Sequence, residues 1–132
     1  MKLIRTLARN TEGVTAVEFA FIAPIFLGFL FVLFDLGRVY LLRSSLDYAL
    51  SEAGRYALVH TSATDAQLVS QVTSAFHGGS SSNLQVTSST QTLNGQSYHV
   101  MTASYPAASI VSGFMHRGNV TLTSTASIPI NP

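Results

Sequence analysis

The fold of this chain is decided by GVTAVEFAFIAPIFLGFLFVLF, which occupies residues 13–34. From Val14 to Phe34, the only ionisable side chain is that of Glu18. A helix of this length rises about 31 Å at 1.5 Å per residue, which matches the hydrocarbon thickness of a bilayer. We therefore predict a transmembrane helix over residues 14–34, surrounded by membrane lipid and carrying one carboxylate near its start.

A basic leader, residues 1–13, precedes this helix. Its three basic residues outnumber its one acid, Glu12, so the leader has a net charge of +2. Residues 35–132 hold equal numbers of arginines and acids and no lysine, so the basic excess lies on the N-terminal side. Because positive charge favours the cytoplasmic side, we expect a single-pass protein with a cytoplasmic N-terminus and the C-terminal part outside.

A cleaved secretory signal has a similar outline, but two features oppose it. The apolar run is longer than the apolar core of a signal peptide, which usually has about 7 to 15 residues. It is also followed by Asp35-Leu36-Gly37-Arg38, which is not a cleavage site of the small-x-small kind. We therefore expect the apolar helix to stay in the protein.

The helix is expected to continue beyond the bilayer as an amphipathic segment, residues 35–60. At 100° per residue, its apolar side chains fall in an arc of about 120°, with polar side chains on most of the opposite side. The arc holds Val39, Leu42, Leu46, Ala49, Leu50, Ala53, Tyr56 and Ala57, and only Leu41 and Tyr48 intrude on the polar side. One helix of more than 40 residues is therefore predicted. Pro24 lies inside it and cannot bond to the carbonyl of Ala20, so we expect a kink there.

Residues 61–132 are expected to form a small α+β head. Thr64-Asp65-Ala66-Gln67 has the form of a capping box, which predicts a short helix that stops at Gly78-Gly79. A Ser-rich loop follows at residues 80–83. Three strands are then predicted, over residues 84–93, 96–105 and 120–128.

Turn chemistry and alternation support these strands. Asn94-Gly95 lies between the first two runs and is a strong hairpin signal. Tyr105-Pro106 should end the second strand, and residues 107–115 form an apolar connector. Apolar and hydroxyl side chains alternate in the third strand, so one of its faces should meet the core. We predict a three-stranded antiparallel sheet laid on the small-residue stripe Ala49, Ala53 and Ala57.

The composition argues against several function classes. Charged residues are only 10% of the chain and the net charge is +1, so there is no basic surface for nucleic acid. Cysteine is absent, which excludes disulfides and thiolate metal sites. The histidines are far apart and form no H-E-x-x-H pattern, so we expect no metal and no cofactor. Without a G-x-S-x-G or S-x-x-K motif, the sequence predicts no catalytic residue, no small-molecule substrate and no enzyme activity.

Glu18 allows two interpretations. A charged carboxylate at a helix centre costs about 2.5 to 3.5 kcal/mol on insertion, less near a helix end, and such groups usually have a partner. Glu18 follows Gly13 by only five residues, so its carboxylate can lie near the interface and reach the lipid headgroups. In the other interpretation, it lies in the membrane and has a polar or charged partner there.

The residues around Glu18 resemble a known family. Gly13, then Glu18-Phe19 and Ala20-Phe21-Ile22-Ala23-Pro24-Ile25, are similar to the type IV prepilin processing site and to the TadE-like family of the tight-adherence (Flp) pilus system. The runs at residues 34–38 and 51–57 are similar to the family's continuation, with the order Ala53-Gly54 as a small departure. The resemblance covers roughly Gly13 to Ala57.

This resemblance implies a minor pilin or pseudopilin that is cut after Gly13 by a prepilin peptidase and methylated at the new N-terminus, Val14. The carboxylate of Glu18, followed by Phe19, would meet the N-terminal amine of a neighbouring subunit, since opposite charges offset each other's desolvation. The implied partners are other pilin subunits, the pilus assembly machinery and the peptidase. The implied location is the inner membrane, with a periplasmic head, and a place in or at the tip of a pilus.

One alternative of another class stays open. The chain could be an unprocessed, signal-anchored periplasmic adaptor or binding protein, in which Glu18 is only interfacial. The two hypotheses differ in whether the mature protein keeps its leader.

Overall fold

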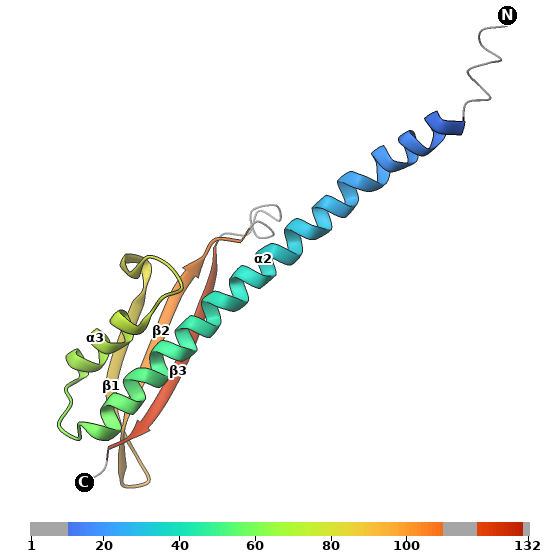
Figure 1. The fold of residues 1–132 in the computed structure, drawn as a ribbon. Helices are drawn as coiled ribbons and strands as arrows, with labels where there is room; N and C mark the ends of the chain where they lie inside the picture. Colours follow the sequence, from blue (N-terminus) through green and yellow to red (C-terminus); the bar gives the residue numbers. More distant parts are fainter. Residues whose placement is uncertain (1–10, 110–118, 131–132) are drawn as a thin grey trace, which may run out of the picture. The chain divides into compact units, whose positions relative to one another are not determined.

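A computed structural model describes residues 11–109 and 119–130 of the chain (Figure 1). The described elements are α2 (Thr11–Val59), α3 (Asp65–Ala75), the 3₁₀-helix η1 (Ser81–Asn83), β1 (Gln85–Leu93), β2 (Gln96–Ala107) and β3 (Val120–Pro129). The chain forms two compact units, one ending at Asp35 and one beginning at Leu36, and α2 contributes to both. The predicted α+β fold, with one long helix, one short helix and a three-stranded antiparallel sheet, is confirmed.

The C-terminal half of α2 buries the side that its periodicity predicts. The apolar arc is buried or half-buried, with Leu46, Ala49 and Ala53 at 0% exposure. The two side chains expected on the polar side, Leu41 and Tyr48, are exposed. Apolar residues at helical spacing thus form a stripe that packs on the rest of the second unit and stabilises this part of α2 as a helix.

The capping box predicted before α3 is present. The backbone N–H of Gln67 donates to Thr64 Oγ1 at 3.4 Å, and the backbone N–H of Thr64 donates to Gln67 Oε1 at 3.0 Å. These bonds satisfy two donors that the first turn of a helix leaves without partners. The helix ends at Ala75, and Phe76 is its C-cap, just before the glycines that were expected to stop it. Instead of a plain loop, the following Ser-rich segment contains η1.

The sheet has the order β1-β2-β3, and both pairs of strands are antiparallel. Asn94 and Gly95 both have positive φ angles, 53° and 81°, as a two-residue type I′ hairpin turn requires. The predicted end of the second strand at Tyr105 is wrong, because β2 continues through Pro106 to Ala107. The strand β1 reaches only as far as Ser104 of β2, so Pro106 lies where β2 pairs with β3 alone, and proline is tolerated at such an edge.

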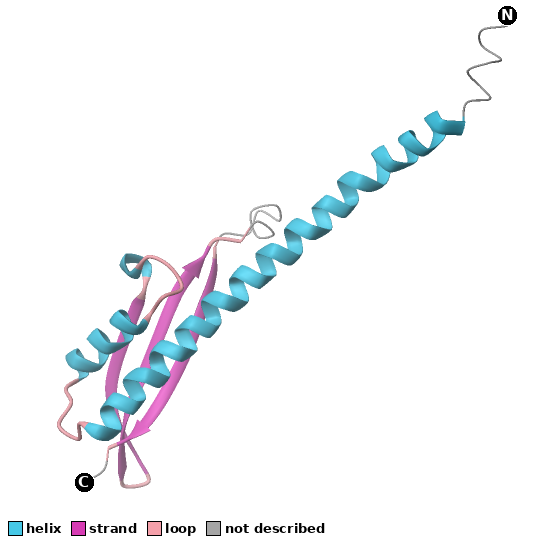
Figure 2. Cartoon of the chain, in the orientation of Figure 1, coloured by secondary structure: helices cyan, strands magenta, loops and turns pink. Residues whose placement is uncertain are grey.

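Figure 2 shows α2 and α3 on the same side of the sheet. Alternate residues of β2, among them Met101 and Ala103, are buried there together with Leu122 and Ile128 of β3. A Cβ added to Gly54 of α2 would lie 3.3 Å from Ile128 Cδ1, so helix and strand approach closely. The predicted packing of the sheet on the small-residue stripe of α2 is confirmed. The connector expected over residues 107–115 lies mostly outside the described residues.

Candidate functional site

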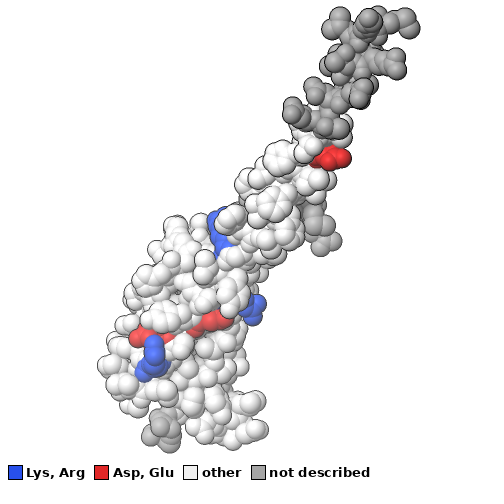
Figure 3. All heavy atoms as spheres, turned by 45° about the vertical axis from the view of Figure 1, so that its right-hand side comes forward, with Lys and Arg blue, Asp and Glu red and all other residues white. Residues whose placement is uncertain are grey.

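The first unit presents apolar side chains on all sides of α2. Exposed fractions reach 71% at Phe19, 74% at Phe21 and 75% at Phe34. No charged residue lies between Glu18 and Asp35, and Figure 3 shows this segment as a white surface. Among the described residues, α2 is the one helix long and apolar enough to cross a membrane by length and composition. Such a helix near the N-terminus fits a membrane anchor, since lipid can cover side chains that the protein does not.

The expected processing site, Gly13 and Val14, lies in the first turn of α2. A Cβ added to Gly13 would meet no atom within 4 Å, so packing inside the chain does not require glycine at this position. Val14 is 58% exposed. The bond after Gly13 therefore lies in an exposed part of α2.

Glu18 and Phe19 lie one turn further along α2, and both are exposed. Within the part of the chain that the structure describes, the Glu18 carboxylate has no hydrogen bond and no ion pair. Pro24 is inside α2, which is helical on both sides of it. The kink at Pro24 stays a prediction.

These five residues lie along one helix and do not converge on a pocket. Gly13 and Pro24 are eleven residues apart, or about 16 Å at 1.5 Å per residue. Residues spread along a helix surface can be recognised by other proteins, but they cannot act together on one substrate atom.

Asp35 is an acid whose burial the sequence did not indicate. Its exposed fraction is 3%, the lowest among the charged residues of the described segments. It follows directly after the apolar run, where an exposed interfacial residue would be the ordinary expectation. Burial of a carboxyl group is tolerated when polar groups interact with it. Asp35 is thus a second acid on α2, besides Glu18, in an unusual position.

A polar cluster in the second unit joins α3 to the sheet. Ser88 Oγ of β1 donates to Asp65 Oδ1 at 2.6 Å, and His99 Nδ1 of β2 lies 3.2 Å from the same oxygen. The side chain of His99 is only 13% exposed. Asp65 is in the first turn of α3, where a negative charge also interacts favourably with the helix dipole. The sequence missed this cluster because its members are 23 and 34 residues from Asp65.

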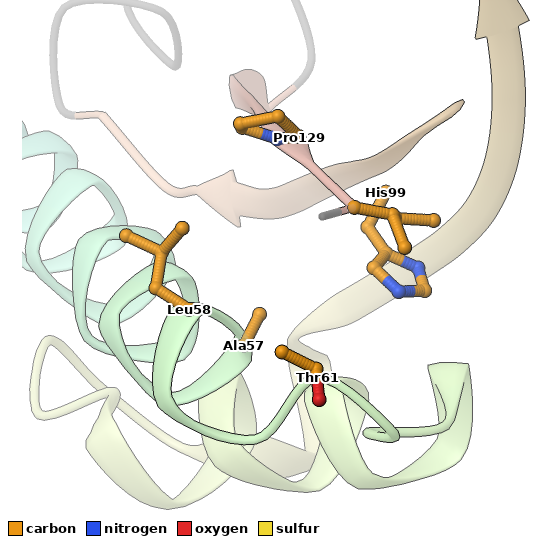
Figure 4. A pocket seen from close by; sticks show the side chains of 6 residues that line it. Ala57, Leu58, Thr61, His99 and Pro129 are labelled. Carbon is orange, nitrogen blue, oxygen red and sulfur yellow. The ribbon is translucent and has the colours of Figure 1, made fainter. Parts of the chain in front are cut away.

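This cluster does not form a catalytic site. Ser88 and His99 both contact Asp65, so the imidazole is not placed to take the proton of the serine hydroxyl. His99 lines a pocket of about 10 Å³ with Ala57, Leu58, Thr61 and Pro129 (Figure 4). That volume holds about one water molecule. No group of three or more potential metal ligands occurs within residues 11–109 and 119–130.

A surface ion pair on α2 joins Glu52 to Arg55. The Glu52 carboxylate raises the pKa of Arg55, chiefly by accepting a hydrogen bond from the guanidinium and also by charge attraction. Both side chains are substantially exposed, so this pair contributes little to stability.

Comparison with protein families matches residues 13–66 to the TadE-like protein family. Residues 13–66 are similar to TadE-like proteins. This match confirms the resemblance read from the sequence and extends it from Ala57 to Ala66, the second residue of α3. Comparison with curated proteins and with solved structures found no match.

The TadE-like segment begins at Gly13, the residue after which cleavage is expected. It includes the apolar half of α2, the amphipathic half, the linker from His60 to Thr64 and the start of α3. The three strands lie beyond it. The family suggests involvement in the tight-adherence pilus system and is not an enzyme family.

Proposed function

We propose that this chain is a minor pilin or pseudopilin that helps to assemble a Flp/Tad-type pilus for surface attachment. The observation that carries the proposal is the TadE-like match, which starts at Gly13 and lies on a helix with an exposed apolar surface. In this role the chain makes and breaks no bonds, and its partners are other pilin subunits, the assembly machinery and a prepilin peptidase. The head lies in the periplasm or at the fibre tip.

The exposed anchor supports such an assembly role. Side chains such as Phe21 and Phe34 need an apolar environment, and either lipid or the helices of other subunits can supply it. Between helices in a membrane, close packing and polar contacts drive association, because lipid tails are as apolar as the side chains. The same surface can therefore pass from lipid to a bundle of subunits with little change in solvation.

Cleavage after Gly13 changes the charge balance at the start of the anchor. It removes the basic leader and leaves a new amine at Val14, four residues before Glu18. The Glu18 carboxylate, which has no partner among the described residues, then has amines available on its own chain and on neighbouring subunits. The new amine is the backbone nitrogen of Val14, so it would lie about one helical turn before Glu18. A carboxylate in lipid is costly, so pairing with a neighbouring amine favours association.

The processing claim is tested by the intact mass of the protein extracted from membranes of cells with and without the prepilin peptidase. We expect residues 1–13 to be absent only when the peptidase is present. A protein that keeps its leader in both strains contradicts the processing claim and favours the signal-anchored adaptor.

The role of Glu18 is tested separately by Glu18→Ala and Glu18→Gln, with Val17→Ala as a control on a neighbouring apolar position. We expect both Glu18 variants to be cleaved normally and to lose pilus assembly, and the control to keep it. Normal pili with Glu18→Ala would remove the proposed role of the carboxylate without touching the processing claim.

A further inference from the structure

The outer face of the sheet, opposite α2 and α3, carries a hollow of about 310 Å³ at its hairpin end. Its lining comes from all three strands and consists of Gln91, Thr92, Leu93, Tyr98, Val100 and Ser127. Gln91 pairs with Tyr98 and Val100 pairs with Ser127 in the strand register, so these four side chains form one continuous patch. A volume of this size is within the range of small-molecule sites.

The chemistry of the hollow excludes charged ligands. The three strands contain no Lys, Arg, Asp or Glu. An ionic ligand would lose hydration in the hollow without gaining an opposite charge. The three described strands therefore offer no charge that would attract an ion or a phosphate backbone.

The groups that remain fit a neutral ligand with many hydroxyl groups. The Gln91 amide and the Ser127 hydroxyl can each donate and accept hydrogen bonds, as a sugar hydroxyl also can. The hydroxyl of Thr92 bonds with that of Ser97 at 3.2 Å, so it contributes less to a ligand. The Tyr98 ring, with Leu93 and Val100, supplies flat apolar surface beside these polar groups. A sugar ring has the same division, with C–H groups on its faces and hydroxyls at its edge.

We infer that this hollow is a binding site for a neutral sugar, held between the Tyr98 ring and the polar groups of Gln91 and Ser127. The site goes beyond the proposed pilus function and does not depend on it. It lies outside the TadE-like segment, so the match does not bear on it.

The test uses the full chain in dodecylphosphocholine micelles, because many common detergents carry sugar headgroups that would compete. Saturation-transfer difference NMR is recorded with glucose, galactose, mannose and N-acetylglucosamine as neutral probes, and with glucuronic acid as a charged one. We expect transfer to the C–H protons of at least one neutral sugar and none to glucuronic acid. Absence of transfer to all four neutral sugars at about 10 mM overturns the inference.

Variants of Tyr98 test whether the sugar binds in the hollow and whether the aromatic ring is required. Tyr98→Ala should weaken binding by roughly two- to tenfold, the range expected for losing one aromatic contact. Tyr98→Phe keeps the ring and should bind nearly as well, and Thr123→Ala, exposed on β3 outside the hollow, is the control. Equal binding by Tyr98→Ala and the control contradicts the assignment of the site.

A second copy of the chain is the other candidate for covering this face. Sedimentation of the wild type and Tyr98→Ala, without sugar, distinguishes the two. Association that Tyr98→Ala abolishes would show that a second copy occupies the hollow and would overturn the inference. Because these measurements need neither peptidase nor pilus, their failure leaves the proposed function intact.

Discussion

The packing of α2 on the sheet can be tested with one substitution made at two positions of the same helix. Leu46 is 0% exposed in the core, and Leu41 is 69% exposed on the polar side. Leucine and alanine have similar helix propensities, so replacing either changes packing far more than helix formation. Leu46→Ala should destabilise the head by about 2 to 5 kcal/mol, from lost burial and the cavity left behind. Leu41→Ala should change its stability by no more than about 0.5 kcal/mol.

Hydrogen exchange of the full chain in micelles, read by mass spectrometry, measures this difference. The amides of Met101 and Ala103 lie in the central strand, β2, and exchange when the head opens. When the head recloses faster than its amides exchange, the exchange rate reflects the free energy of opening. Leu46→Ala should then raise the exchange rates of these amides by a factor between about 30 and a few thousand. Leu41→Ala should speed it by about twofold at most.

An internal control comes from the anchor amides of residues 20–34, whose exchange should be the same in all three proteins because lipid or detergent protects them. Equal acceleration of β2 exchange by the two substitutions would refute the reasoning. It would mean that the apolar arc assigned from the helical periodicity of α2 is not the surface that packs on the sheet.

Three further substitutions test local features of the head. Thr64→Ala removes the capping box and should destabilise α3 by about 1 kcal/mol, seen as faster exchange of its amides. Gly78→Ala places a Cβ 3.0 Å from Phe76 Cε2 and should destabilise the head by about 1 to 3 kcal/mol, measured by its melting temperature, whereas Gly37→Ala, with nothing within 4 Å, should not. Gly95→Ala puts a side chain at a φ of 81° and should cost about 1 to 2 kcal/mol, measured by urea unfolding.

The features that the sequence predicted well depend on local chemistry. The apolar arc of α2 follows from helical periodicity, and residues four apart meet whatever lies elsewhere in the chain. The capping box at Thr64 and the turn at Asn94-Gly95 are likewise set by residues at most three positions apart. Each of these signals is strong because few backbone conformations satisfy it.

The features that the sequence missed depend on contacts across the chain. Asp65 and His99 are 34 residues apart, and only the register of the sheet under α3 brings them together. The end of β2 was placed at Tyr105 because proline usually stops a strand, but the shorter reach of β1 leaves Pro106 at a tolerated edge. The hollow at Tyr98 likewise needs three strands in register, so no single run of residues encodes it.

The position of the TadE-like match divides the properties of this chain into two groups. Glu18 and the exposed anchor lie within residues 13–66, so the assembly role proposed for them rests on the part of the chain that is similar to TadE-like proteins. Tyr98 and the hollow lie on strands beyond that segment, so the proposed sugar binding does not rest on the TadE-like match. The two roles should then separate on mutation. Glu18→Ala should abolish assembly and leave sugar binding by the head unchanged, while Tyr98→Ala should leave pili intact and weaken only the binding.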